Sequence, residues 1–293
     1  EEKRVQAEGA VNTIEAALGS LDTEKSGQMP KTIPEFLGVL EASVRERLGE
    51  DPEVAARLYV IAGKAYLSIQ ESQAADRVLS LAEKIVAQDG DESEQLAMIV
   101  HNLGRVYFFY GVAARRDALN AGTAGRHEAE AEFRAMELKW FETAVATYTE
   151  ALGMRARVLK RPHFDTAMST QHLAAATREL AVSIRTIEGE EAASRVEALF
   201  DASELKLGEA LDHWQMLHGP SSSQVASTIN SLARTAMVRD RPREGLDRYL
   251  QAYQMAMEHG TPEEDYRIGR AAKNVAMAHR VLGDWEAAIE WLE

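Results

Sequence analysis

Small residues recur at fixed distances along the sequence, and this pattern constrains the fold more than any other feature. Gly63 is followed by Ala75 twelve residues later and by Leu79 sixteen residues later. Gly245 likewise follows Ala233 at a distance of twelve residues. Two antiparallel helices can approach closely only where their facing side chains are small. The spacing therefore predicts repeated pairs of helices that make their closest contact at these residues.

Five anchor residues of this kind divide the chain into units. Apolar residues recur between them at helical spacing, no segment alternates with the period of a strand, and aromatic residues make up only 6% of the chain. The anchors are Gly63, Gly104, Ala174, Ala233 and Ala276. The predicted division is a helical lead-in at 1–50 and a repeat array at 51–293, with units near 52–90, 91–160, 162–218 and 220–260 and a truncated unit at 262–293.

The second and third units are longer than the others, which predicts two elongated hairpins. The small-residue pattern of the second unit resumes at Ala144, forty residues after Gly104 instead of twelve. We place this insertion at 112–139 with its turn at 120–125, so that each helix gains roughly 18 Å at about 1.5 Å per residue. In the third unit, the pattern places the turn at 188–190 and the second helix at Ser203.

The anchor pattern resembles that of tetratricopeptide repeat (TPR) domains. The shorter anchor separations, 41 and 43 residues, exceed the plain TPR period of about 34 residues. They resemble the kinesin light chain subclass of these repeats, as does the stretch HGPSSSQVASTINSLA at 218–233. The resemblance implies an all-α, right-handed solenoid of about five helical hairpins, two of them elongated by insertions, with a concave face that binds proteins or peptides.

About residues 1–110 carry a second resemblance. AEGAVN at 7–12 and TIPEFLGVLEASVRERLGEDPEVAARLYVIAGKAYLS at 32–68 look like the region after the membrane span of bacterial TPR-containing serine/threonine kinases. The resemblance implies a helix near 33–48 before the first repeat and a role in signalling. The chain has no kinase motif, begins without Met and ends inside a periodic apolar run, so we expect the non-catalytic part of a longer protein. Its location is then cytoplasmic, or extracytoplasmic beyond a membrane span.

The first helix of each unit lines the concave face of a TPR array, and these inner positions are basic. Eight of the 25 predicted inner positions are Lys or Arg and one is acidic, whereas the whole chain has a net charge of −14. A basic groove would attract an acidic protein segment, and Arg suits bidentate contact with carboxylates. The expected peptide-binding residues are Arg57, Lys64, His101, Asn102, Arg105, Phe108, Arg178, Asn230, Arg234, Arg270, Lys273 and Asn274.

Two of these residues have a role implied by the resemblance. Kinesin-light-chain-like repeats use Asn at the position of Asn102 and Asn274 to hold an extended peptide backbone. A competing interpretation of the basic positions is that the cations pair with acids on neighbouring helices, where each exposed pair contributes about 0–1 kcal/mol.

Several chemistries are not predicted. The chain has no cysteine, which excludes a disulfide scaffold, a zinc-thiolate site and a thiol nucleophile. No zincin, nucleophile-elbow or phosphate-loop motif is present, so we expect no enzyme activity, no metal and no cofactor. The negative charge disfavours nucleic acid as a partner, and no run approaches the roughly 20 apolar residues that span a bilayer.

Two other functions remain open from the sequence. One is a structural or oligomerisation module, in which residues 112–139 pack on a second copy to form a homodimer. The other is a regulatory domain that binds a small anionic ligand between repeats.

Overall fold

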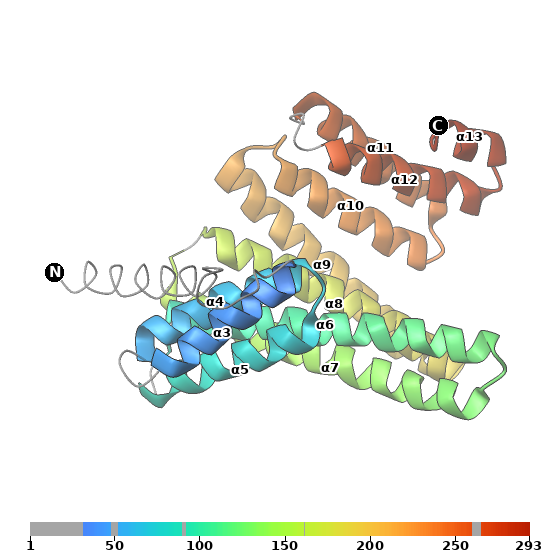
Figure 1. Cartoon of the computed structure of the whole chain (residues 1–293). Helices are drawn as coiled ribbons and strands as arrows, with labels where there is room; N and C mark the ends of the chain where they lie inside the picture. Colours follow the sequence, from blue (N-terminus) through green and yellow to red (C-terminus); the bar gives the residue numbers. More distant parts are fainter. Residues whose placement is uncertain (1–31, 48–51, 90–91, 161, 260–264) are drawn as a thin grey trace.

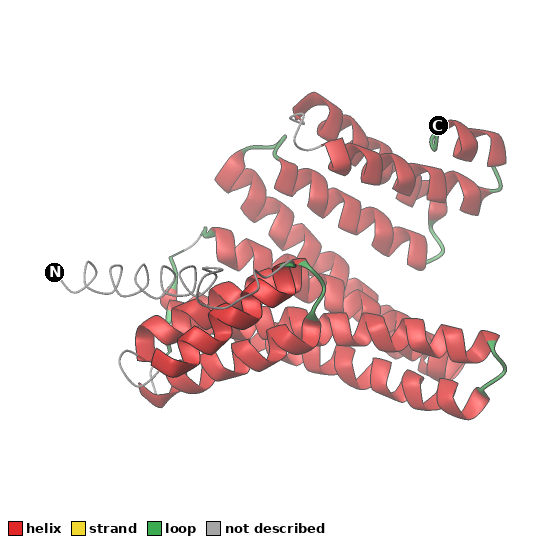
Figure 2. Ribbon diagram, viewed as in Figure 1, coloured by secondary structure: helices red, strands yellow, loops and turns green. Residues whose placement is uncertain are grey.

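The computed structural model describes residues 32–47, 52–89, 92–160, 162–259 and 265–293, and in these ranges it contains helices and no strand (Figures 1 and 2). In these ranges, one helix precedes five helical hairpins. The helices are α3 (Ile33–Arg47); α4 (Pro52–Ser68) and α5 (Ser72–Val86); α6 (Glu94–Thr123) and α7 (His127–Val158); α8 (Phe164–Glu188) and α9 (Ala193–His218); α10 (Ser223–Val238) and α11 (Pro242–His259); α12 (Asp265–Leu282) and α13 (Trp285–Glu290).

The small residues lie where the two helices of a hairpin meet. A Cβ built on Gly63 would lie 2.6 Å from Leu79 Cγ, and one built on Gly104 would lie 2.9 Å from the Tyr148 ring. In the third unit, Ser203 Oγ donates to the Ala174 carbonyl at 2.8 Å. The sequence register is therefore confirmed across both insertions, because Gly104 and Ala174 contact positions of the resumed pattern, Tyr148 and Ser203.

The same turn closes four of the five hairpins. The last residue before the second helix donates its backbone N–H to the carbonyl five residues earlier, after one residue with positive φ, as in a Schellman motif. The four donor–acceptor pairs are Glu71 to Tyr66, Arg126 to Ala121, Arg241 to Ala236 and Asp284 to His279, at 2.9–3.0 Å. The same turn therefore closes the three short hairpins and the long α6–α7 hairpin.

Two hairpins are elongated, as the insertions predict. The helices α6 and α7 have 30 and 32 residues, and α8 and α9 have 25 and 26. The long hairpins pack on each other: Phe141 of α7 is buried with Leu180 and Ile184 of α8 and Phe200 of α9. The second unit therefore packs on the third through α7, next to the arm at 112–139.

Some expectations concern residues outside the described ranges. These are residues 1–31 and 48–50 of the helical lead-in and residues 262–264 of the truncated unit. Among the described helices, none combines the length and the apolar character needed to span a membrane.

Substitution of Gly104 tests the close approach of α6 and α7. We expect Gly104→Ala to lower the free energy of unfolding by about 1–3 kcal/mol, because its Cβ would overlap the buried Tyr148 ring. Gly208 is the matched control, since it lies inside α9 with no atom within 4 Å of a new Cβ. Gly208→Ala is expected to stabilise the helix by about 0.5–1 kcal/mol. Equal effects of the two changes in urea denaturation would contradict this packing.

Candidate peptide-binding groove

The five first helices, α4, α6, α8, α10 and α12, present one face that we call the first-helix face. Side-chain contacts join each of these helices to the next along this face. The contacts are Lys64 Nζ to Met98 Sδ (3.2 Å), His101 Nε2 to His172 Nδ1 (3.3 Å), Gln171 Nε2 to Ser227 Oγ (3.2 Å) and Asn274 Nδ2 to Asn230 Oδ1 (2.7 Å). A continuous polar row thus runs from the first unit to the fifth.

His101 is a buried member of this row. It is only 3% exposed, its Nδ1 is 2.8 Å from Ser169 Oγ, and its ring stacks on His172 with 5.1 Å between centroids. Burial lowers the pKa of His101 well below its ordinary value, and the nearby positive groups lower it further. Burial, with Arg105 and Arg155, lowers the pKa of His172 to about 4. Both imidazoles are therefore neutral at pH 7, and the prediction that His101 contacts a partner is corrected.

Asn102 is also buried, contrary to the expectation of an exposed amide. It is 2% exposed, its Nδ2 donates to the Met98 carbonyl at 2.8 Å, and its Oδ1 accepts from Arg105 at 3.2 Å. Its hydrogen bonds are made within α6, so no amide ladder extends through this unit. Asn230 and Asn274 are half-buried and bond to each other instead.

Phe108 packs into the core between units. Its ring lies 5.7 Å from that of Phe141, edge to face, and it contacts the cluster around Phe141, while the adjacent Phe109 packs on the cluster of the first unit. The two consecutive rings therefore pack on different clusters, and Phe108, predicted to bind a peptide, is a packing residue in the structure.

The basic residues on the first-helix face fall into two groups. Arg57 pairs with Glu53 at 2.7 Å, and Arg234 pairs with Glu179 at 3.0 Å. Among the predicted binding residues, the other exposed or half-buried cations make no ion pair with any residue in the described ranges. They are Lys64, Arg105, Arg270 and Lys273. Two of the predicted basic residues thus pair with acids of this chain, and four remain available to bind a partner.

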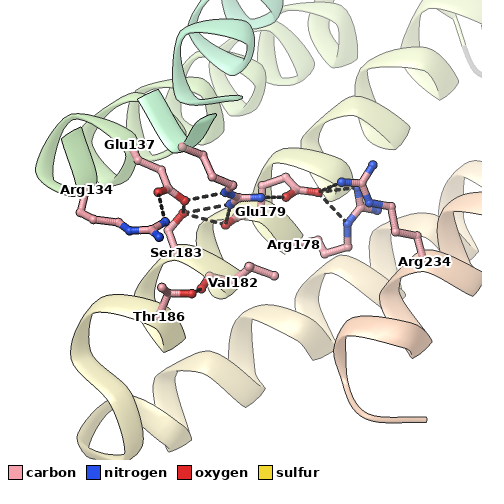
Figure 3. Close-up of polar contacts among 9 residues, drawn as sticks. Arg134, Glu137, Arg178, Glu179, Val182, Ser183, Thr186 and Arg234 are labelled. Carbon is pink, nitrogen blue, oxygen red and sulfur yellow. Dashed lines mark hydrogen bonds and ion pairs between the residues drawn. The ribbon is translucent and has the colours of Figure 1, made fainter. Parts of the chain in front are cut away.

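Arg178 belongs to a buried charge network and does not reach the surface (Figure 3). It is 3% exposed, and its Nε and Nη2 donate to Glu179 Oε1 at 3.1 and 2.9 Å. Arg234 Nη2 reaches the same oxygen, and Arg115 Nη1 bonds to Oε2. The prediction that Arg178 binds a partner is therefore corrected, because the side chain is buried and its Nε and Nη2 are bonded to Glu179 on the same helix, while its buried Nη1 has no hydrogen-bond partner among the described residues.

The network continues into the long hairpin of the second unit. Glu137, 1% exposed, accepts from Arg115 Nε at 2.6 Å and from Arg134 Nη1 at 2.9 Å, and Ser183 of α8 donates to it at 2.7 Å (Figure 3). Burial alone would raise the pKa of Glu179, but Arg178, Arg234 and Arg115 lower it to about 2. Four arginines and two glutamates thus bind α6, α7, α8 and α10 together.

A cavity of about 300 Å³ opens on the first-helix face between the third, fourth and fifth units. The sequence pattern did not predict this cavity, because its walls combine first and second helices from three different hairpins. Its lining includes the predicted site residues Asn230 and Arg270, together with Gln171, His172 and Trp214.

One group of His and carboxylate side chains in the described chain has the spacing of metal ligands. The donor atoms of Glu94, His163 and Asp165 lie within 4.8 Å of one another. His163 Nδ1 already accepts the backbone N–H of Asp165, and the Asp165 carboxylate lies 3.6 Å from Arg155. These contacts give the group a structural role at the start of α8.

The repeated turns, the close contacts at small residues and the continuous first-helix face define the class: this is a helical-repeat array of the TPR type. Two solved structures show the particular kind. BtubC (BKLC) from P. vanneervenii is 15% identical, with a TM-score of 0.53 over 97% of this chain and 88% of that chain. A kinesin light chain protein of P. anserina with nearly identical TPR-like repeats is also 15% identical, with a TM-score of 0.50 over 80% of this chain and 90% of that chain.

These likenesses establish the fold, which is that of TPR-like repeats of the kinesin light chain kind. No protein-family model and no curated protein matches the sequence. Repeat arrays of this fold form extended surfaces that serve as protein-binding faces.

Proposed function

We propose that the chain is a non-catalytic protein-binding module that docks an extended acidic segment of a partner along its first-helix face. The observation that carries this proposal is the set of four cations, Lys64, Arg105, Arg270 and Lys273, that make no ion pair with a described residue. On a chain with a net charge of −14, unpaired cations on one face create a local positive potential that attracts acidic groups.

The polar row supports binding of an extended backbone. Side-chain amides both donate and accept hydrogen bonds, so they suit the alternating N–H and C=O groups of a peptide main chain. Asn230 and Asn274 lie on successive first helices at half-buried positions. A partner with acidic side chains would therefore find amides for its backbone and guanidinium or ammonium groups for its carboxylates.

The wider setting that we propose is a signalling protein of the bacterial kinase type. The support is the resemblance of about residues 1–110 to the region after the membrane span in TPR-containing serine/threonine kinases. In the described ranges, α3 (Ile33–Arg47) precedes the first hairpin, as that resemblance implies. The reading frame upstream of Glu1 tests this setting: it should encode a membrane span and a kinase domain.

The homodimer through residues 112–139 stays a prediction. Leu119 and Met136 of this arm are exposed. Arg115 and Glu137 of the same arm pair with each other and contact Glu179 and Ser183 of the third unit. The arm therefore has a role within one chain, and the acidic-segment proposal does not depend on a second copy.

Charge reversal on the first-helix face tests the proposed function. Peptides selected by the unaltered protein from a random display library are expected to be rich in Asp and Glu. The double variant Lys64→Glu, Arg105→Glu should then bind the selected peptides at least about tenfold more weakly, since each hydrogen bond to a charged group contributes about 1.5–3 kcal/mol. Fluorescence anisotropy with labelled peptides measures the change.

The matched control carries the same change of charge away from this face. Arg116 and Lys139 are exposed on the long hairpin, and Arg116→Glu with Lys139→Glu should leave peptide affinity nearly unchanged. Selection of neutral or basic peptides, or equal loss in both double variants, would overturn the proposal.

A further inference from the structure

The cavity between the third, fourth and fifth units combines an apolar wall with a small set of polar groups. Its volume of about 300 Å³ falls at the lower end of ligand pockets. The apolar wall is formed by Phe164, Met168, Trp214, Met255 and Ile268. Aromatic, thioether and branched side chains on one wall fit a compact apolar group better than a water cluster.

The described polar groups that line the cavity include hydrogen-bond donors without a partner and no carboxylate. Gln171 is satisfied on both ends, because its Oε1 accepts from Trp214 Nε1 at 3.1 Å and its Nε2 donates to Ser227. Asn230 Oδ1 accepts from Asn274, which leaves the Asn230 Nδ2 as a free donor. Arg270 lines the cavity without an ion pair to any described residue, and none of the described lining residues is acidic.

A chain of hydrogen bonds assigns a further donor to His172. Arg155 is always protonated, and its Nη1 lies 2.5 Å from Ser169 Oγ and 3.5 Å from His101 Nδ1, which favours the tautomer in which Nδ1 carries no proton and accepts from the Ser169 hydroxyl. His101 then carries its proton on Nε2 and donates to His172 Nδ1 at 3.3 Å. In neutral His172 the proton is consequently on Nε2, the ring nitrogen that has no partner among the described residues.

We propose that this cavity binds a small acid that joins one carboxylate to a compact apolar group, with the carboxylate on Arg270, Asn230 and His172 Nε2–H and the apolar group against Trp214 and Met255. The charge and hydrogen-bond character of the lining select this class. A cationic ligand would meet Arg270, and a purely apolar ligand would leave three donors unsatisfied in the cavity. The site is separate from Lys64 and Arg105, which do not line it.

Titration with octanoate tests the site. Octanoate is expected to bind the full chain saturably in calorimetry and to shift the indole N–H signal of Trp214 in a ¹H–¹⁵N spectrum. That signal is one of four from the four tryptophans and is identified by Trp214→Phe. Arg270→Gln should weaken binding about tenfold or more, because a charge-assisted hydrogen bond is lost. Ala256→Phe, which fills the half-buried lining position on α11, should abolish it.

Three controls make the result decisive. Arg280→Gln removes an exposed cation of the same helix that does not line the cavity, and it should bind octanoate like the unaltered chain. Octylamine and acetate lack the carboxylate and the apolar group, respectively, and should not bind saturably. Absence of octanoate binding, or equal binding by Arg270→Gln, would overturn the proposal, and circular dichroism verifies that each variant is folded.

The same chemistry can come from a free acid or from an apolar residue at a peptide's C-terminus. Acetyl-Gly-Gly-Leu with a free carboxylate and its C-terminal amide distinguish the two sources. Tighter binding of octanoate identifies a free acid, and tighter binding of the peptide acid than of both octanoate and the amide identifies a peptide terminus. The Lys64 and Arg105 variant described above leaves this cavity intact, so this proposal and the acidic-segment proposal fail independently.

Discussion

Replacing Glu179 with glutamine is expected to lower the free energy of unfolding by about 3–5 kcal/mol. The carboxylate is 2% exposed and is the common partner of Arg115, Arg178 and Arg234. Glutamine has nearly the same volume, so the loss comes from leaving buried guanidinium groups without their counter-charge and not from a cavity. Denaturation in urea at pH 7 measures the change.

The pH dependence of the same variant provides a second measurement. The pKa of Glu179 in the folded chain is about 2, lowered from an ordinary value of 4.5. A carboxyl group whose pKa is lowered by folding stabilises the folded chain at pH values above its pKa in the unfolded chain. This contribution disappears as the pH falls from about 4.5 towards 2. The unaltered chain should lose this stability in that window, whereas Glu179→Gln should not.

Glu197 is the matched control for Glu179. Its carboxylate pairs with Arg239 at 2.6 Å but is 58% exposed. Glu197→Gln is expected to change the free energy of unfolding by about 0–1 kcal/mol, as for other surface pairs. Equal effects of the two substitutions would show that the buried network adds no more than a surface ion pair.

Acidification from pH 6.5 to pH 4 is expected to destabilise the chain by about 3 kcal/mol through His172 alone. The pKa of His172 is lowered from 6.5 to about 4, first by burial and then by Arg105 and Arg155. In this range the unfolded chain binds a proton at His172 that the folded chain does not. Stability is therefore complete above pH 6.5 and falls as the pH approaches 4, a window above that of Glu179.

His172→Gln should make the stability profile between pH 6.5 and pH 4 less steep, because it removes one of the two buried imidazoles, His101 and His172, whose pKa is lowered in the folded chain. Tyr148, His101, Arg105 and Arg155 surround the ring, and none of them supplies a negative charge that would stabilise the imidazolium. The control is His127→Gln, since the His127 side chain on the long hairpin is 85% exposed. Profiles of His172→Gln and the unaltered chain that run parallel would contradict the role of this buried imidazole.

The fold could be predicted from the sequence because its determinants are local and repeated. Gly63, Gly104 and Ala174 each mark the contact between the two helices of their own hairpin, where a small side chain permits close approach. Even the insertions could be placed, since Ser203 lies opposite Ala174 as the resumed pattern required. The register between the two helices of a hairpin depends on steric contact at these residues, so it is unchanged when residues are inserted near the turn.

The candidate site could be predicted only in part. The position of a residue on its first helix predicted which side chains are exposed on the first-helix face, and this prediction holds for Lys64 and Arg270. The position did not predict which side chains of neighbouring helices would cover the others. His101 is covered by Tyr148 and His172, and Arg178 is held by an acid beside it. Arg115 and Glu137 lie in the insertion, which has no counterpart in the repeat pattern, so their contacts had no template.

Repeat arrays are commonly treated as strings of interchangeable blocks, because each block contacts only its neighbours. The second and third units here do not have that independence. Arg115 and Glu137 of one long hairpin match Glu179 and Ser183 of the other, and Phe141 packs into the third unit. A graft or a recombination event that moved either unit alone would separate complementary halves, so the smallest transferable piece of this region is two units long.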